Sequence, residues 1–232
     1  MVRYLGPKLK IIRRLGILPG LTQKKSTLRK KTPGQHGKKL SLQNTRTSLS
    51  NDYNEKLLEK QKLRYHYGLT ERQLLGYYQM AKKKKSSTGS LLLSFLESRL
   101  DCILFRLGFA PTINAARQLI SHRHILVNNF LVNIPSFLCK QSDIISIKKS
   151  LRSQNIVKTF FEKKSKKRDL ILKRAKQIKL QNINEKYLAK FLLPSHLKIE
   201  ENPLRGHVIG SLKRKNVSVH VNELKVIEYY SR

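Results

Sequence analysis

The most regular pattern of apolar positions along the chain lies between Thr88 and Gly108. Leucine, isoleucine and phenylalanine recur there every three or four residues, the spacing that places side chains on one face of an α-helix. We therefore predict one core helix that ends at Gly108, because glycine readily adopts the left-handed conformation of a helix C-terminus. Thr112 can cap a second helix, with Ala116 and Ile120 facing inward.

Two further helices are predicted before this segment. Asn51 or Asp52 can cap a helix that runs to about Tyr67. Thr70 and Gln73 have the spacing of a capping box, in which each side chain binds the backbone N–H of the other residue. A helix that begins after Thr70 is therefore expected.

A β-type pattern follows these helices. The runs His124–Val127 and Phe130–Ile134 are rich in β-branched and aromatic residues and flank Asn128-Asn129. Asparagine tolerates the left-handed conformation that a tight hairpin turn requires, so we predict a β-hairpin here. Asp143–Ile147 is predicted as a third short strand.

The C-terminal third of the chain has a weaker pattern. The Lys-rich residues 151–190 have a roughly helical spacing of apolar residues, and a solvated charged helix is the alternative to a functional one. After Pro194 the β-type pieces His207–Leu212, Val217–Val221 and Leu224–Tyr230 follow, and the last is apolar enough to pack on the core.

The first 50 residues are strongly basic. They contain thirteen Lys or Arg, and no acidic residue precedes Asp52. Too few apolar residues are present to fold this segment by burial, so we expect it to become ordered on a partner. A tail without a role is the alternative.

Together these patterns predict an α+β fold in five parts. The parts are a basic extension (1–50), a helical N-terminal domain continued by C-terminal packing segments (51–96), a small helix–helix–hairpin domain (97–150), a Lys-rich insertion (151–190) and a β-containing C-terminal segment that packs on the core (191–232).

The charge of the chain favours nucleic acid as its class of partner. It has 49 Lys and Arg against 14 Asp and Glu, a formal net charge of +35. Nucleic acid would relieve the self-repulsion by pairing cations with phosphates and releasing counterions. An anionic membrane surface is the alternative partner, although no apolar run approaches the roughly 20 residues that span a bilayer.

The sequence offers little for metal binding or catalysis. Cys102 and Cys139 are too few for a structural zinc site and are expected to be reduced thiols. The histidines lack metal-ligand spacing, and no catalytic triad or carboxylate pair is evident. We therefore expect no enzymatic activity, no cofactor, no bound metal and no small-molecule substrate.

Polar residues gather on the outer side of the helix that Thr112 caps and beside the hairpin. Arginine can bind phosphates in planar, bidentate geometry, and the amides and hydroxyls can bond sugars or base edges. Duplex RNA is recognised through backbone, shape and 2′-hydroxyls, which suits a rigid helix beside a hairpin. Ordinary surface polarity is the alternative. The residues are Arg117, Gln118, Ser121, His122, Arg123 and Asn128.

Several stretches resemble the RNA-binding domain named after ribosomal protein S4. They are Ser98-Arg99-Leu100-Asp101, Phe105-Arg106-Leu107-Gly108-Phe109, Ala116-Arg117-Gln118-Leu119-Ile120, Ile125-Leu126-Val127-Asn128 and Ile134-Pro135-Ser136. The flanks resemble the small-subunit ribosomal protein S4 family itself, in its plastid form. They are Arg3-Tyr4-Leu5-Gly6-Pro7, Pro33-Gly34-Gln35-His36-Gly37, Tyr67-Gly68-Leu69-Thr70-Glu71-Arg72-Gln73 and Asn222-Glu223-Leu224 through Glu228-Tyr229-Tyr230-Ser231.

The resemblance implies a structural constituent of the small ribosomal subunit. Such proteins bind small-subunit rRNA directly at a multi-helix junction of the 5′ domain and nucleate assembly of the subunit body. They contact neighbouring ribosomal proteins, lie near the channel through which mRNA enters, and influence decoding accuracy. The rRNA-binding residues that we expect are Arg3, Tyr4, Lys8, Lys10, Arg13, Arg14, Gln35, His36, Lys38, Lys62, Arg64, Arg72, Arg99, Arg117, Gln118, Ser121, His122, Arg123 and Asn128.

The chain departs from the family pattern in three places. Asn129 stands where the family hairpin usually has glycine, the Lys-rich residues 151–190 look like an expansion, and the first 101 residues lack the zinc-binding cysteines of some relatives. The family-like N-terminus starts at Met1 and leaves no room for a transit peptide. We therefore expect a chloroplast protein made in the organelle, with a bacterial cytoplasm as the alternative.

Two other functions are compatible with parts of the sequence. Arg99-Leu100-Asp101 resembles the motif that holds the catalytic Asp of pseudouridine synthases, which often carry the same RNA-binding domain. No catalytic domain of sufficient size accompanies it, so we interpret Asp101 as structural. Nonspecific packaging of DNA is the second alternative, and it predicts equal affinity for duplex DNA and structured rRNA.

Overall fold

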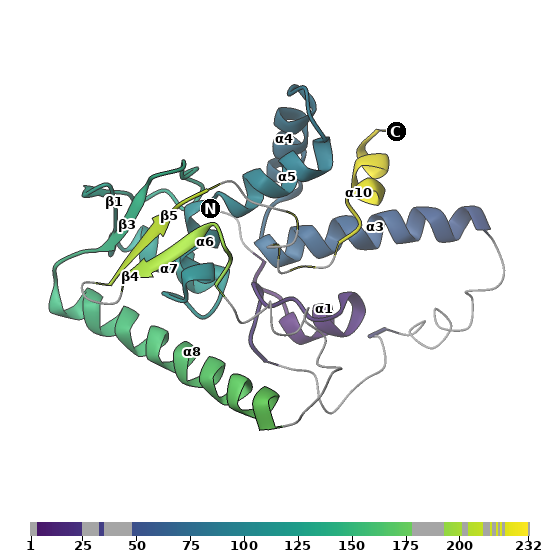
Figure 1. Cartoon of the computed structure of the whole chain (residues 1–232). Helices are drawn as coiled ribbons and strands as arrows, with labels where there is room; N and C mark the ends of the chain where they lie inside the picture. The colour runs from purple at the N-terminus through teal and green to yellow at the C-terminus, as the bar shows by residue number, and fades with distance from the viewer. Residues whose placement is uncertain are drawn as a thin grey trace. The chain divides into compact units, whose positions relative to one another are not determined.

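The chain forms two compact units in the computed structural model. They are Met1–Leu93 with Val219–Arg232, which we call the terminal unit, and Ser94–Ser218, which we call the central unit. Within the residues described, eight helices and one five-stranded sheet are present (Figure 1). This confirms the α+β class. The structure describes residues 4–24, 33–34, 48–177, 193–200, 204–210, 214, 217, 219 and 221–231.

The terminal unit is helical in its described residues. Its helices are α1 (Lys8–Leu15), α3 (Ser48–Tyr67), α4 (Glu71–Lys82), the start of α5 (Thr88–Glu97), and α10 (Glu223–Tyr230). The capping box of α4 is present as predicted, because the Thr70 hydroxyl accepts from Gln73 N and the Gln73 side chain accepts from Thr70 N. The helix expected between residues 51 and 67 is also confirmed, and it begins three residues earlier.

The N-terminal segment corrects one prediction. Residues 4–24 contain α1 and a set of apolar residues that is buried within the protein. Its members are Ile11, Ile12, Leu15, Leu18 and Leu21. Residues 4–24 therefore pack by burial, contrary to our expectation that the segment has too few apolar residues. Residues 25–32 and 35–47 lie outside the described part of the chain, and ordering of the extension on a partner stays a prediction. The charge is carried by the opposite side of α1, which is how a basic helix can still be amphipathic.

The C-terminal segment corrects a second prediction. Leu224–Tyr230 was expected to be a strand, but Glu223–Tyr230 forms helix α10, capped by the Asn222 side chain, which accepts from Leu224 N. The described residues of the predicted strand 217–221 are not in a strand either. Helix α10 packs against α3, in agreement with the prediction that this end joins the fold.

Polar and aromatic contacts hold α10 on α3 and α4. The Lys60 ammonium lies 3.0 Å from Glu71 Oε1 and 4.2 Å from the centre of the Tyr229 ring. The Tyr230 hydroxyl donates to the same Glu71 oxygen at 2.8 Å, and its ring stacks on Tyr78. Burial and this carboxylate both raise the pKa of Tyr230, so the hydroxyl stays protonated and donating.

The central unit is built on one antiparallel sheet. The strand order is β2-β1-β3-β5-β4, and every neighbouring pair is antiparallel. The strands are β1 (Ile125–Val127), β2 (Phe130–Leu131), β3 (Ile144–Ile147), β4 (Leu197–Glu200) and β5 (Arg205–Val208). The hairpin and the third strand are confirmed, the predicted strand 207–212 overlaps β5, and β4 was not predicted.

Helices α6 (Leu100–Leu107) and α7 (Ile113–Ser121) cover one face of this sheet (Figure 1). They bury an apolar core between them that includes Leu104 and Ile120 from the helices and Ile125 and Ile145 from the strands. Gly206 in β5 lies directly under α6, because a Cβ at this position would collide with the Leu107 side chain. The core thus fixes the distance between sheet and helices.

The prediction of one continuous helix from Thr88 to Gly108 is wrong, because the structure has two helices there. The segment is divided into α5 and α6, because Arg99 has an extended backbone with ψ of 140° and forms a β-bridge with Leu138. Leu100 N donates to Phe137 O at 2.9 Å in the same place. The predicted C-terminus is confirmed: Gly108 has φ of +94° and its N–H donates to Leu104 O.

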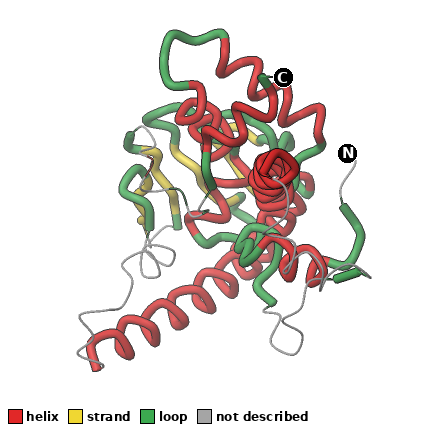
Figure 2. The backbone as a smooth tube through the Cα atoms, turned by 90° about the vertical axis from the view of Figure 1, so that its right-hand side faces the viewer, coloured by secondary structure: helices red, strands yellow, loops and turns green. Residues whose placement is uncertain are grey.

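Helix α8 (Leu151–Gln177) confirms that the Lys-rich stretch is helical up to residue 177. Residues 178–190 of that prediction lie outside the described part of the chain. Figure 2 shows α8 as one continuous helix that runs away from the sheet of the central unit. Its N-terminal half joins the core through Val157, which is fully buried.

Candidate nucleic-acid interface

A buried cluster of ion pairs fixes the two helices that carry the predicted RNA-binding residues. The Asp101 carboxylate is 0% exposed and accepts from Arg99 Nε at 3.0 Å, Arg99 Nη2 at 2.9 Å and Arg117 Nε at 2.8 Å. It also accepts from Cys102 N at 2.9 Å. Because Arg117 belongs to α7 and Asp101 to α6, this carboxylate fixes the orientation of α7.

Arg99, one of the predicted RNA-binding residues, is buried in the structure. Its side chain is 1% exposed and its Nε and Nη2 atoms donate to Asp101, so its charge acts inside the fold. Arg117 differs, because its side chain is 11% exposed and stands at the edge of the cluster. Sequence analysis could not separate the two arginines, since both lie in stretches that match the RNA-binding domain.

The outer side of α7 presents the other predicted residues together. Gln118 and Ser121 are exposed on the helix, and His122 and Arg123 are exposed at its C-terminal end. The buried side holds Ala116 and Ile120, as the pattern predicted. These four polar side chains therefore stand on a helix that cannot easily shift.

Arg123 occupies a position where helices usually have glycine. It has φ of +60°, and α7 ends in a Schellman-type pair of bonds, from Arg123 N to Ile120 O and from His124 N to Leu119 O. A left-handed conformation costs about 1–2 kcal/mol in a residue with a Cβ. A bulky cation is thus retained here in spite of backbone strain.

Two histidines stand beside this helix end. The rings of His122 and His124 are stacked with centroids 6.1 Å apart, and His124 Nδ1 lies 2.8 Å from the hydroxyl of Ser153 in α8. Burial lowers the pKa of His124, and the nearby charges of His122, Arg152 and Lys148 lower it further. The corner between α7 and α8 is therefore cationic without help from His124.

Replacing Arg152 by glutamine is expected to raise the pKa of His124. Removal of a neighbouring positive charge makes protonation of the ring less unfavourable, although burial still holds the pKa below its ordinary value. An NMR titration of the His124 ring measures the shift. Lys158→Gln, further along α8, is the matched control and should leave the midpoint unchanged; an unchanged midpoint for Arg152→Gln would contradict the proximity of its charge.

Asn128 has a structural task in the hairpin turn. Asn128 and Asn129 have φ of +50° and +69°, the conformation that the turn requires, so asparagine replaces glycine as expected. The Asn128 side chain donates to Asp143 Oδ1 at 2.9 Å and accepts from Ile144 N at 2.8 Å. Its amide fixes the register of β1 and β3, and a contact with RNA stays a prediction.

The terminal unit gathers a second group of predicted residues around Tyr65. The Tyr4 ring meets the Tyr65 ring edge-on at 5.4 Å, and the Arg64 guanidinium lies 5.4 Å from the centre of the same ring. Lys62 is paired with Glu59 one turn earlier in α3. Tyr4 of the N-terminal segment and Arg64 of α3 thus both contact the ring of Tyr65.

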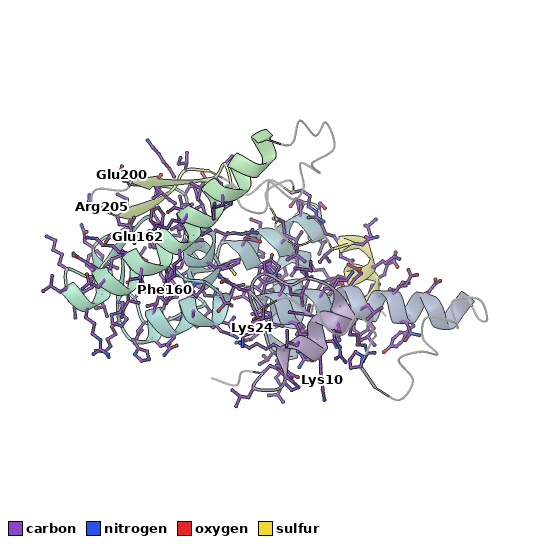
Figure 3. The ribbon with its side chains drawn as sticks, turned by 90° about the horizontal axis from the view of Figure 1, so that it is seen from below. Lys10, Lys24, Phe160, Glu162, Glu200 and Arg205 are labelled. Atoms are coloured by element: carbon purple, nitrogen blue, oxygen red, sulfur yellow. The ribbon has the colours of Figure 1, made fainter. Side chains whose placement is uncertain are left out.

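The other predicted residues of the terminal unit are dispersed. Lys10 and Arg14 are exposed on α1, whereas Lys8 and Arg13 are half-buried there, and Arg72 is exposed in α4. Figure 3 shows Lys10 and Lys24 on the N-terminal segment. The predicted residues that lie outside the described part of the chain are Arg3, Gln35, His36 and Lys38.

Sequence analysis missed the basic residues where the chain passes from β3 into α8. Lys148, Lys149 and Arg152 are exposed, and Lys148 N donates to His124 O at 2.9 Å. The signal was present as three cations within five residues, Lys148-Lys149-Ser150-Leu151-Arg152. It was not used because these residues fall between two predicted domains.

The structure contains no evident catalytic or metal centre in its described residues. Asp101 has no exposed surface, which is incompatible with attack on a substrate and agrees with its structural interpretation. No group of three or more His, Cys, Asp or Glu in the described ranges is arranged to hold a metal ion. Cys102 and Cys139 are buried free thiols, and burial raises the pKa of Cys139 to about 12.

No helix in the described part of the chain combines the length and the apolar character needed to cross a membrane.

The sheet, the two helices and their basic outer edge define an RNA-binding protein of the S4-domain class. The model of the S4 domain matches residues 98–145, and that of the ribosomal protein S4/S9 N-terminal domain matches residues 3–97. The chain belongs to the ribosomal protein S4 family, also called uS4, of the small ribosomal subunit. This family is non-enzymatic, and its S4 domain implies binding of rRNA within the subunit.

Similar proteins cover the whole chain. The small ribosomal subunit protein uS4c of Euglena gracilis is 46% identical over 232 residues, which span 100% of this chain and 99% of the relative. The uS4c proteins of Cyanophora paradoxa and Chlorella vulgaris are each 47% identical over 232 residues, spanning 100% of this chain and 100% and 99% of the relatives.

Proposed function

We propose that the chain binds small-subunit rRNA directly at a multi-helix junction, through the outer side of α7 and the corner between α7 and α8. It holds RNA helices in a fixed relation during assembly, and so nucleates formation of the subunit body. Contacts with neighbouring ribosomal proteins, a place near the channel through which mRNA enters, and an influence on decoding accuracy complete the proposal.

The observation that supports this proposal most directly is the strained arginine at the end of α7. Arg123 keeps a left-handed backbone conformation in which glycine would be less strained. Residues held in such conformations concentrate at functional sites, and they persist there because the contacts of the surrounding structure compensate the strain energy. The position beyond the last turn of α7, beside His122, Lys148 and Arg152, is suited to a phosphate oxygen.

The mechanism follows from a rigid site with little to reorganise. The buried Asp101 carboxylate holds α7 against α6, and the sheet supports both helices, so the polar side chains keep their spacing before RNA arrives. Binding then loses little side-chain and backbone entropy. Each cation that meets a phosphate also releases condensed counterions.

Replacing Arg123 by glycine is expected to weaken binding to a small-subunit rRNA transcript by about 1–3 kcal/mol, the range for a hydrogen bond with a charged partner. The same substitution should leave the melting temperature unchanged or raise it, because glycine relieves the strain. Filter binding at fixed salt measures the first effect and circular dichroism the second. Unchanged affinity in a folded variant would remove Arg123 from the proposed site.

Competition with duplex DNA separates this function from nonspecific packaging. A protein that reads RNA shape should be displaced from the transcript by structured rRNA much more readily than by duplex DNA of equal length. Equal competition would favour packaging of DNA and contradict the proposal. Arg205→Gln is the matched control for Arg123→Gly in the binding assays. Arg205 is an exposed cation of the same unit, and its backbone is opposite that of Glu200 in the sheet (Figure 3).

We also propose that the protein works in a plastid ribosome. The relatives described above, each 46–47% identical, carry the name uS4c and span the whole chain. Co-sedimentation with small subunits from isolated plastids tests this location. Recovery from a bacterial cytoplasm would support the alternative.

A further inference from the structure

Helix α8 is attached to the central unit along one side. Val157 is fully buried in the core, and Phe161 meets Phe109 edge-on with ring centroids 6.5 Å apart. Lys164 reaches across to the end of α6, where its ammonium donates to Phe105 O at 3.3 Å and Arg106 O at 2.6 Å. These three residues recur at four- and three-residue intervals, so a definite face of α8 is turned outward.

The outward face carries a stripe of five exposed polar residues, which we call the α8 stripe. At 100° per residue its members lie within about 80° of one another around the helix, and at 1.5 Å per residue they extend over roughly 21 Å. Three are cations and two are short hydrogen-bonding side chains. The members are Arg152, Asn155, Thr159, Lys163 and Lys166.

The cations of the stripe are not used in the fold of the described residues. Within that part of the chain, none of the three has a carboxylate partner. A solvated charged helix is usually laced with pairs of opposite charge three or four residues apart. Glu162, which is labelled in Figure 3, is exposed on α8. It forms no ion pair with Lys158 or Lys166, although both are within four residues of it.

The stripe is continuous with the interface at the end of α7. Arg152, its first member, acts electrostatically on His124, as does Lys148. Lys148 N donates to His124 O, and Ser153 binds the ring of His124. The corner and the stripe therefore form one continuous cationic surface. An RNA helix that is already bound at α7 has lost its rotational freedom, so contact with α8 would not cost that entropy again.

We propose that the α8 stripe is a second binding site for RNA, which takes the phosphate backbone of a helix whose other part is held at α7. This inference rests on the proposed function and deepens it. The cations bind phosphates, and the Asn155 amide donates to phosphate or 2′-hydroxyl oxygens. The Thr159 hydroxyl donates to Ile156 O at 2.8 Å, so it contributes as an acceptor for a 2′-hydroxyl. The site recognises the geometry of the backbone and not its sequence.

The salt dependence of binding tests the stripe by charge count. We expect Lys163→Gln/Lys166→Gln to reduce the slope of log affinity against log salt by about 1.5, because each neutralised phosphate contributes roughly 0.7–0.9. Arg152 is left in place because it also belongs to the corner at the end of α7. The double variant Lys140→Gln/Lys198→Gln removes the same charge from exposed positions of the central unit and should leave the slope nearly unchanged. Equal reductions in both variants, or none in the first, would overturn the stripe.

A tethered probe gives an independent readout. Cys102 and Cys139 are buried and burial raises the pKa of both thiols, so an iron chelate should attach selectively to Thr159→Cys. Hydroxyl radicals generated there should cut one localised stretch of the bound rRNA transcript. The same chelate at Lys198→Cys on β4 is the control, and absence of cuts from Thr159→Cys in a bound complex would contradict the proposal.

The two proposals fail in different ways. If the unmodified protein shows a slope near zero with the rRNA transcript, the proposed function is wrong and the stripe with it. If the unmodified protein binds steeply and Arg123→Gly weakens it, while the stripe variant behaves as the control variant does, only the stripe is wrong. Circular dichroism of each variant confirms that α8 is retained.

Discussion

Replacing Asp101 by asparagine is expected to lower the free energy of unfolding by about 3–5 kcal/mol, the usual cost of removing one partner from a buried ion pair. The substitution keeps the size of the side chain but removes the carboxylate that Arg99 and Arg117 share, and Arg99 has almost no access to water. Urea unfolding followed by circular dichroism measures the change as a lower midpoint.

The control for this prediction removes a carboxylate of lower burial. Asp143→Asn also raises the net charge by one, but Asp143 bonds Asn128 and Lys140 N near the surface, so a loss of about 0.5–1.5 kcal/mol is expected. Equal midpoints for the two variants would show that net charge, and not the buried cluster, sets the stability. The same Asp101 variant also tests RNA modification. If the unmodified protein formed pseudouridine in an RNA transcript and Asp101→Asn did not, the structural role of Asp101 would be contradicted.

Replacing Phe109 by alanine is expected to cost about 3–5 kcal/mol, the range for truncation of a buried aromatic side chain. Phe109 is fully buried between α6 and α7 and is the residue that Phe161 of α8 contacts. Its loss should therefore weaken both the core and the attachment of α8. Hydrogen exchange measures the second effect as faster exchange of the α8 amides around Val157 and Lys164.

Phe109→Leu is the matched control because it retains most of the apolar volume, and a clearly smaller loss of stability is expected. If Phe109→Ala lowered stability while protection of α8 remained that of the unmodified protein, the helix would be held by Lys164 and Val157 alone. If Phe109→Ala did not change the free energy of unfolding at all, the position of Phe109 in the buried core would be contradicted.

The features that could be predicted from sequence are those with a local physical cause. Thr70 and Thr112 cap their helices as expected because a side-chain hydroxyl three residues before a backbone N–H satisfies it in any context. Gly108 and the Asn128-Asn129 turn depend on backbone conformations that few residues tolerate. Neighbouring residues alone decide these features.

The features that could not be predicted depend on contacts distant in sequence. The apolar spacing continues unbroken from α5 into α6, yet the bridge between Arg99 and Leu138 breaks the helix, because that strand-like contact satisfies the backbone there. In α10 the residues favour a strand by composition, but the Asn222 cap and packing against α3 select a helix. Tertiary contacts outweigh propensity in both cases.

The candidate interface shows the same division. Exposed residues of α7 could be predicted because they alternate with a clear apolar face. The burial of Arg99 could not, since its partners Asp101 and Arg117 converge only after α6 and α7 pack together. In the N-terminal segment the high charge obscured a small apolar set that is nevertheless buried.

The placement of the acidic residues affects how an RNA molecule first meets this protein. Glu97 and Asp101 are almost completely enclosed by the central unit, and Glu59 is largely covered in the terminal unit. The outward electric field is consequently more uniform in sign than a count of fourteen acids suggests. Diffusional capture of a polyanion should be fast at low ionic strength and should slow sharply as salt shortens the range of attraction.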